Sequence, residues 1–196
     1  RQLLQQEGPH VGGLGAARCV HPNDHVNLGQ SSNDVFPTAM HVAAVLRTRP
    51  LLAALAGLRA AIRAKAEAFA DMPKVGRTHL QDAMPIRLGQ EFAAYARSMS
   101  RARRRVAEAA DYLNDLGIGG SAVGTGVTVE PQYPLLMIEQ LRDISGVTTL
   151  RVGEDRIQLM QSMGDVAAFS AALRGVAVDL SKIASDLRLM VSGPRT

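Results

Sequence analysis

Residues 159–190, LMQSMGDVAAFSAALRGVAVDLSKIASDLRLM, carry apolar residues that recur every seven positions in two tracks. The first track holds Leu159, Val166, Leu173, Leu180 and Leu187, and the second, which begins at Ser162, holds Phe169, Val176, Ile183 and Met190. This heptad pattern is typical of a helix that supercoils with neighbouring helices. At about 1.5 Å per residue the helix would be about 50 Å long. Helices of this length cannot bury their apolar faces within one chain of 196 residues, so we expect a homo-oligomeric bundle.

The composition of the chain favours helices over sheets. Aromatic residues make up only 4% of the chain, tryptophan is absent, and alanine, leucine, valine and methionine dominate the hydrophobic fraction of 46%. This mixture suits helix packing better than a β-sandwich, which relies on aromatic and β-branched residues. We therefore predict an all-α fold built as a long-helix bundle. The single cysteine, Cys19, excludes an internal disulfide and indicates a reducing compartment, so the predicted location is cytoplasmic.

Charge and hydropathy argue against two classes of partner. The net charge is only +4, and the densest basic cluster, Arg101 with Arg103, Arg104 and Arg105, lacks the aromatic residues that stack on bases. No apolar run reaches the length of a membrane span, and the first residues do not resemble a signal sequence. We predict neither a nucleic-acid partner nor a membrane partner.

Two further long helices are expected upstream of the heptad segment. The first is capped by Asn33 or Asp34 and has Pro37 in its first turn, where a missing N–H costs little. Pro50 lies inside this helix and should kink it or divide it in two, and Pro73 ends it. The second helix buries one face over about seven turns. That face is formed by Leu88, Phe92, Tyr95, Met99, Ala102, Val106, Ala110 and Leu113.

A glycine-rich segment separates the second helix from a shorter one. Residues 117–126 contain the pattern G-x-G-x-x-A, but a dinucleotide-binding fingerprint requires a preceding strand, and here a helix precedes the pattern. We interpret the segment as a flexible turn whose small residues let the backbone approach a ligand. The shorter helix is expected over residues 133–145 and should end near Gly146. No cofactor is predicted.

The tripeptide Ser31-Ser32-Asn33 stands directly before the first long helix. Two hydroxyls, an amide and the N–H groups of the first turn form a corner that can bind an anion, helped by the helix dipole. The alternative is an ordinary helix cap. Taken alone, the tripeptide favours the cap.

A second polar motif, Thr78-His79, is predicted in a loop between the first two long helices. An imidazole beside a hydroxyl suits the binding of a carboxylate or the transfer of a proton. A histidine in a loop is usually structural, and the flanking Arg77, Gln81 and Asp82 bring the functional interpretation level with the structural one.

His21 and His25 are four residues apart, a spacing that suits metal ligands on a helix. Pro22 disfavours a helix there, and no further ligands are evident, so no metal is predicted. His21, Asn23 and Asp24 are interpreted instead as a small polar surface site.

Taken together, these segments resemble the class II fumarase/aspartase superfamily. The four matching segments stand in the family's order and span residues 19–196. They are His21-Pro-Asn-Asp-His-Val-Asn27 with Gln30-Ser-Ser-Asn-Asp34, Gly76-Arg-Thr-His-Leu-Gln-Asp-Ala-Met-Pro85 with Leu88-Gly-Gln-Glu-Phe92, Ala122-Val-Gly-Thr-Gly126, and Ser181-Lys-Ile-Ala-Ser-Asp-Leu-Arg-Leu-Met190 with Ser192-Gly-Pro-Arg195.

The resemblance implies a central bundle of long helices that assembles into a homotetramer, with active sites where three subunits meet. It implies a small dicarboxylate substrate (aspartate, malate or fumarate) and a reversible anti-elimination that forms fumarate. Ser31–Asn33 would bind a substrate carboxylate or the leaving group, and Thr78 would bind a carboxylate. His79 would be the catalytic histidine that manages the proton of the leaving group. A second, peripheral anion site would comprise His21, Asn23 and Asp24.

The chain also departs from the family pattern. The family's third signature, a loop that carries the serine base, would follow Ser192-Gly-Pro-Arg195 but does not occur before Thr196. Residues 1–33 would be a remnant of the N-terminal domain with the first signature loop, and residues 34–196 an incomplete central helical bundle domain. Thr128 stands where the family usually has asparagine. We expect the full-length parent to be an enzyme and this chain alone to be inactive.

Ammonia and water are alternative leaving groups. The segment from His25 to Asn33 resembles fumarases, whereas residues 85–89, 163–170 and 181–190 resemble aspartases. Because the later segments are longer, they favour an aspartate ammonia-lyase, with a class II fumarate hydratase as the alternative. A truncated, non-catalytic helical assembly module is a further alternative of another class.

Overall fold

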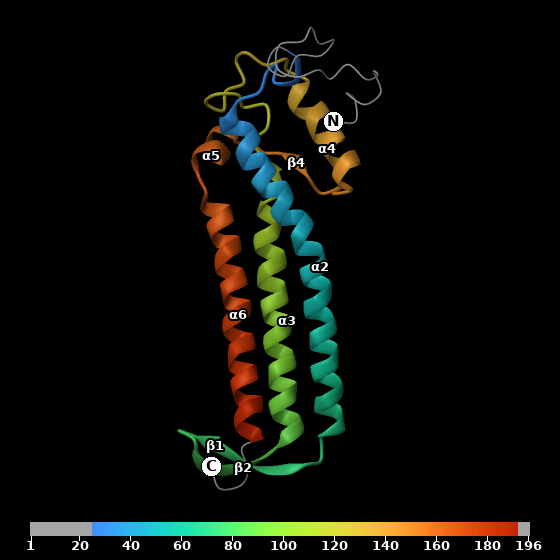
Figure 1. Cartoon of the computed structure of the whole chain (residues 1–196), viewed down its shortest axis with the longest axis vertical. Helices are drawn as coiled ribbons and strands as arrows, with labels where there is room; N and C mark the ends of the chain where they lie inside the picture. The colour runs from blue at the N-terminus through green and yellow to red at the C-terminus, as the bar shows by residue number, and fades with distance from the viewer. Residues whose placement is uncertain (1–24, 192–196) are drawn as a thin grey trace, which may run out of the picture.

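The computed structural model describes residues 25–191, and the long helices of this part form a bundle (Figure 1). α2 (Ser32–Ala68) runs along the molecule, α3 (Leu88–Tyr112) returns beside it, and α6 (Gly164–Met190) packs along the other side of α3. The predicted long-helix bundle is confirmed within the single chain. α3 is the central helix, and both neighbours run antiparallel to it.

The apolar face predicted for α3 forms the core between these helices. Met99, Ala102 and Val106 have no exposed surface. They pack in one cluster whose buried members are Leu55, Met99, Ala102, Val106, Val176 and Ile183, so all three long helices contribute. Full burial of a large apolar side chain contributes about 1.5–3 kcal/mol to the free energy of folding, so this cluster is a main source of the stability of the bundle.

The heptad segment forms two helices rather than one. α5 (Arg156–Gln161) ends at Ser162, which is extended with φ −110° and ψ 130°, and α6 begins at Gly164. The prediction of one helix of about 50 Å is therefore wrong, because α6 has 27 residues, or about 40 Å. Ser162 Oγ accepts a hydrogen bond from the Gly164 N–H at 3.2 Å, which gives the backbone a local alternative to the helix.

The two heptad tracks of α6 differ in burial. Val176 and Ile183 of one track lie in the core, whereas Leu180 and Leu187 of the other are 37% and 40% exposed. Within residues 25–191, therefore, the single chain covers one track much better than the other.

α2 is one continuous helix of 37 residues that contains Pro37 and Pro50. Pro50 therefore does not divide the helix, and Figure 1 shows α2 bending part-way along its length. The helix cap is Ser31 rather than Asn33 or Asp34. Ser31 is extended, its hydroxyl accepts from the Asn33 N–H, and Asp34 completes a capping box.

α2 is also long and apolar enough, by length and composition alone, to cross a membrane. The prediction that no apolar run reaches the length of a membrane span is therefore too strong. The core helix of a soluble protein has the same property, so the absence of a membrane partner stays a prediction.

The upper end of the bundle in Figure 1 is closed by the segments between α3 and α6. β3 (Asp115–Leu116) pairs in parallel with β4 (Arg151–Val152), and α4 (Tyr133–Ser145) lies between them in the chain. α4 matches its prediction and ends at Gly146, which is left-handed with φ 66°. The buried members of a second core cluster are Val45, Leu113, Leu116, Ile118, Ile138, Val147 and Leu150.

A β-hairpin at the lower end departs from the all-α prediction (Figure 1). β1 (Pro73–Thr78) pairs antiparallel with β2 (Gln81–Arg87), with an irregularity between Val75 and Arg77. Most side chains of both strands are exposed. The alternation of apolar and polar residues that marks a half-buried strand is therefore missing from the sequence.

Candidate functional site

Ser31, Ser32 and Asn33 lie at the start of α2, at the upper end of the bundle. Ser31 Oγ accepts a hydrogen bond from the Asn33 N–H at 3.2 Å, and Asn33 Nδ2 donates to the carbonyl of Ala122 at 2.9 Å. The tripeptide thus contains an ordinary helix cap, the alternative that it favours when taken alone, with Ser31 as the capping residue. Capping uses only a lone pair of the hydroxyl, so its proton, the exposed Ser32 hydroxyl and the second amide proton of the exposed Asn33 can still be donated to an anion.

Asp34 makes contacts that the sequence does not predict. Its carboxylate is fully buried, and Oδ1 accepts the Ser31 N–H at 2.9 Å. Oδ2 accepts the N–H of Gly119 at 3.1 Å and that of Ser121 at 3.0 Å. Three N–H donors satisfy the buried charge. Asp34 therefore ties the start of α2 to the glycine-rich segment, a contact across 85 residues that leaves no local signal.

The glycine-rich segment is a tight turn, and the short strand β3, rather than a helix as predicted, directly precedes it. Gly119 and Gly124 have φ of 83° and 93°. A Cβ at Gly119 would lie 2.5 Å from Pro134 Cγ, and a Cβ at Gly124 would lie 2.6 Å from Ile157 Cα. Both positions therefore require glycine. That the backbone approaches a ligand here stays a prediction.

Two neighbouring features complete this end. Ser121 Oγ and Thr128 Oγ1 lie 3.4 Å apart on the exposed side of the turn. A cavity of 640 Å³ opens beside Gly124 and is otherwise lined by residues 152–157. This cavity contains none of the predicted site residues.

Thr78 and His79 lie at the opposite end of the bundle, at the tip of the β1–β2 hairpin. Thr78 pairs with Gln81, and the two residues between them, His79 and Leu80, have φ of 52° and 61°. Two successive left-handed residues form a type I′ turn, which asparagine and glycine usually occupy. A left-handed residue with a side chain costs about 1–2 kcal/mol, and such strain gathers at functional sites.

The base of the hairpin is tied to α3. Lys74 Nζ lies 2.7 Å from Glu91 Oε2, and the two side chains are only 27% and 22% exposed. The Leu88 N–H also donates to the carbonyl of Met72 at 2.9 Å. Closer to the tip, Arg77 and Asp82 face one another across the strands at 4.0 Å.

A second polar contact near this end joins α3 to α6. The Tyr95 hydroxyl donates to Asp186 Oδ2 at 2.8 Å, and Lys182 Nζ bonds the same oxygen. Burial and the hydrogen bond to Asp186 raise the pKa of Tyr95 above its usual value. Burial alone would raise the pKa of Asp186, but the hydrogen bonds from Lys182 and Tyr95 and the charges of Lys182 and Lys74 outweigh it and lower that pKa.

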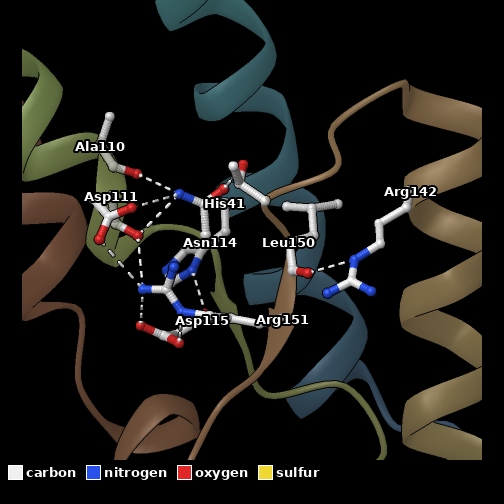
Figure 2. A network of polar contacts seen from close by, with 9 residues as sticks. His41, Ala110, Asp111, Asn114, Asp115, Arg142, Leu150 and Arg151 are labelled. Atoms are coloured by element: carbon white, nitrogen blue, oxygen red, sulfur yellow. Dashed lines mark hydrogen bonds and ion pairs between the residues drawn. The ribbon is translucent and has the colours of Figure 1, made fainter.

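A polar network that the sequence did not predict lies at the upper end (Figure 2). Arg151 of β4 holds both oxygens of Asp115, at 2.7 and 2.9 Å, and approaches Asp111 at 3.5 Å. Asn114 Nδ2 donates to the carbonyl of Asp111 at 3.0 Å, and His41 Nδ1 lies 3.1 Å from the carbonyl of Asp115. These charges already pair with one another, so the network locks α2, the end of α3 and β4 together.

The two predicted groups cannot meet within one chain. Ser31–Asn33 and the hairpin tip are separated by the 37 residues of α2, or about 55 Å. Figure 1 places them at opposite ends of the bundle. A site that uses both groups must therefore take them from different chains.

The remaining site predictions concern the N-terminal segment and metal binding. His21, Asn23 and Asp24 lie outside the described residues. Between residues 25 and 191, no group of three or more histidine, cysteine, aspartate or glutamate side chains is placed to hold a metal ion.

Comparison with known proteins decides the family. The family described as lyase matches residues 8–196. The chain belongs to the fumarase/aspartase family of lyases. It is 44% identical over 177 residues to the class II fumarate hydratase of Bacillus subtilis, and 43% identical over 177 residues to the aspartate ammonia-lyase of the same organism. Both alignments cover 90% of this chain but 38% and 37% of the relatives.

Solved structures of family members share the fold. The fumarate lyase:delta crystallin from Brucella melitensis bound to cobalt matches with a TM-score of 0.86 at 43% identity, covering 93% of this chain and 39% of that one. A class II fumarase from Schistosoma mansoni matches with a TM-score of 0.86 at 31% identity, covering 92% and 41%. The resemblance inferred from the motifs is thus confirmed, and the chain spans about two fifths of the length of the relatives it matches.

Proposed function

We propose that the full-length protein is a lyase that forms fumarate by reversible anti-elimination from a four-carbon dicarboxylate. Family membership supports the reaction class. The observation that carries the proposal is that one chain presents two groups of hydrogen-bond donors, Ser31–Asn33 and Thr78-His79, at opposite ends of the bundle. Such an arrangement builds a complete site when copies of the chain pack side by side.

The proposed assembly is a homotetramer in which the upper end of one copy meets the hairpin of another. Leu180 and Leu187, each more than a third exposed, offer an apolar track for the contact between copies. Burial of that track would contribute about 25 cal/mol per Å² of apolar surface removed from water.

The proposed chemistry assigns a role to each group. A base takes the proton from the carbon beside one carboxylate, and the electron pair of that C–H bond forms the carbon–carbon double bond as the leaving group departs from the neighbouring carbon. By resemblance to the family, this base would be a serine in the loop that would follow Arg195. Ser31–Asn33 and Thr78 would donate hydrogen bonds to the carboxylates, where preorganised donors stabilise the developing negative charge. His79, exposed at the turn, would exchange a proton with the leaving group.

Water is one candidate for the leaving group, because the chain is 44% identical to the class II fumarate hydratase of Bacillus subtilis, close to its 43% identity to the aspartate ammonia-lyase. Ammonia is the second candidate, carried by the resemblance of residues 163–170 and 181–190 to aspartases. The sequence-based preference for an ammonia-lyase stays a prediction.

An assay on the protein expressed from its complete reading frame tests the proposal. L-malate and L-aspartate are offered separately, and the ultraviolet absorbance of the fumarate double bond is followed. Signal from malate alone identifies a fumarate hydratase, and signal from aspartate alone identifies an ammonia-lyase. No absorbance change with either substrate, in a correctly assembled protein, contradicts the lyase proposal and favours the non-catalytic assembly module.

A further inference from the structure

Asp34 and Asn33 are adjacent in the chain but serve opposite sides of the helix start. The Asn33 side chain is exposed, whereas the Asp34 carboxylate has no exposed surface. One oxygen of Asp34 binds the backbone of Ser31, and the other binds the backbone of the glycine-rich turn. The residue that follows the predicted donors therefore also joins the helix start to a distant segment.

The turn depends on this carboxylate for its shape. Gly119 and Ser121 are both left-handed, with φ of 83° and 58°, and their N–H groups converge on Oδ2 of Asp34. Converging backbone N–H groups of this kind form a nest that binds an anion. Here the anion is the chain's own carboxylate, and it holds Ser121 in a conformation that is unfavourable for a residue with a side chain.

The glycine-rich turn also orients Asn33, one of the residues predicted to donate a hydrogen bond to the substrate. The carbonyl of Ala122, next to Ser121, accepts one amide proton of Asn33 at 2.9 Å. This contact fixes the rotation of the Asn33 amide and directs its second proton and its oxygen. On the other side, Oδ1 of Asp34 holds the backbone of Ser31, whose hydroxyl is the second donor.

We propose that Asp34 is a positioning residue for dicarboxylate binding. Its buried carboxylate holds residues 119–122 against the start of α2, so that Ser31 and Asn33 are oriented before the substrate arrives. The proposal rests on the proposed function, because it needs a dicarboxylate at Ser31–Asn33. Asp34 itself does not touch the substrate.

The test uses Asp34→Asn in the full-length protein. An amide has one oxygen, so its NH₂ group must face an N–H donor of either Ser31 or the turn, and one set of hydrogen bonds is lost. Succinate is the binding probe, since it has both carboxylates and no leaving group. Its Kd is measured by calorimetry, and KM and kcat are measured with whichever substrate the wild-type protein uses.

Misplaced donors should weaken binding before they slow chemistry. We expect the Kd of succinate and the KM of the substrate to rise about 10–10²-fold, the scale of one lost hydrogen bond to a charged group. Because the same donors also stabilise the charge that develops in the transition state, kcat should fall as well, but by less than KM rises. A merely structural role gives the opposite pattern, a lower kcat from fewer folded sites at unchanged KM.

Asp155→Ala is the control, because alanine, unlike asparagine, removes the side-chain cap. The Asp155 carboxylate also accepts two backbone N–H groups at a helix start, those of Ile157 and Gln158, but it makes no contact with Ser31–Asn33 or the Ala122 carbonyl. The Kd of succinate for this control variant should equal that for the wild-type protein. An equal rise in both variants overturns the proposal, because any lost cap would then suffice.

If Asp34→Asn does not fold, the Kd of succinate is measured for Asp34→Glu instead. Glutamate keeps the charge and is a usual partner in a capping box, but its longer side chain displaces the turn. We expect about tenfold weaker succinate binding in a normally folded protein, the scale of one ordinary hydrogen bond. Unchanged succinate binding in a folded variant overturns the proposal.

The proposed function and the positioning role fail in different ways. A wild-type protein that binds succinate but converts neither malate nor aspartate contradicts the proposed activity, while weaker succinate binding by Asp34→Asn still supports the positioning role. A wild-type protein that does not bind succinate overturns the positioning role.

Discussion

The hydroxyl of Tyr95 donates a hydrogen bond of 2.8 Å to Asp186 Oδ2 and so joins α3 to α6 near the hairpin. Lys182 bonds the same oxygen, and the charge of Lys74 at the hairpin base also favours the carboxylate form. Because Lys74 in turn pairs with Glu91, the charges of β1, α3 and α6 act on one another at this end. The element that presents His79 is therefore held by electrostatics as well as by its backbone.

Asp186 should make stability depend on pH in the acid range. Its folded pKa lies below the ordinary value of 3.8, so the unfolded chain binds more protons near that pH. The stabilisation is present above pH 3.8 and is lost as pH falls through the lower, folded pKa. Urea unfolding at a series of pH values should show Asp186→Asn losing less stability than wild type on acidification. Parallel curves for the two proteins would contradict this.

Lys74→Met should loosen the hairpin. The substitution leaves Glu91, which is 22% exposed, without its partner, and the unfolding free energy should fall by about 1–2 kcal/mol. Since the hairpin carries His79, kcat of the full-length protein should fall as well. Arg63→Met is the control, because the pair of Arg63 and Glu67 is 65% and 68% exposed and contributes less than about 0.5 kcal/mol. Equal losses in the two variants would show that burial does not distinguish the pairs.

Leu80→Gly should stabilise the fold. Leu80 is left-handed with φ 61° and 65% exposed, so glycine removes strain while losing little packing. The relief of about 1–2 kcal/mol exceeds the added chain entropy of about 0.5–1 kcal/mol, for a net gain of about 0.5–1 kcal/mol. Leu135→Gly, at a similarly exposed position (62%) in α4, should instead destabilise by about 1 kcal/mol. Denaturant midpoints that move in the same direction would contradict the strain argument.

Local patterns predicted the helices, and the structure departs from prediction where local patterns carry no information. α3 buries the face that its apolar spacing predicts, and α4 ends at the left-handed Gly146, so the local sequence suffices for both helices. The hairpin exposes both strands and turns through His79 and Leu80, which lack the usual turn residues. The heptad pattern continues across Ser162, but the backbone there does not follow it. The hydrogen bonds of Asp34 could not be predicted either, because their donors lie in a turn 85 residues away.

His79→Asn should impair catalysis without unfolding the protein. In the full-length protein we expect kcat to fall by about 10²–10³, the scale of one positioned acid or base. The fold should persist, because His79 is exposed and asparagine tolerates the left-handed conformation with φ 52° that this position requires. A fumarate absorbance assay measures kcat, and thermal unfolding checks that the fold persists. An unchanged kcat would remove His79 from the mechanism.

Mixing two variants that are nearly inactive at a substrate concentration well below KM should restore activity if the site takes its groups from different chains. Asn33→Ala removes a donor at the upper end and His79→Asn removes the histidine at the hairpin, about 55 Å away along the 37 residues of α2. When equal amounts are unfolded and refolded together, a site has an intact upper end with probability one half and an intact hairpin with probability one half. About one quarter of the wild-type activity should therefore return. The same variants mixed without unfolding are the control and should stay inactive. If refolded mixtures form normal oligomers yet remain inactive, both groups must come from the same chain or at least one does not belong to the site.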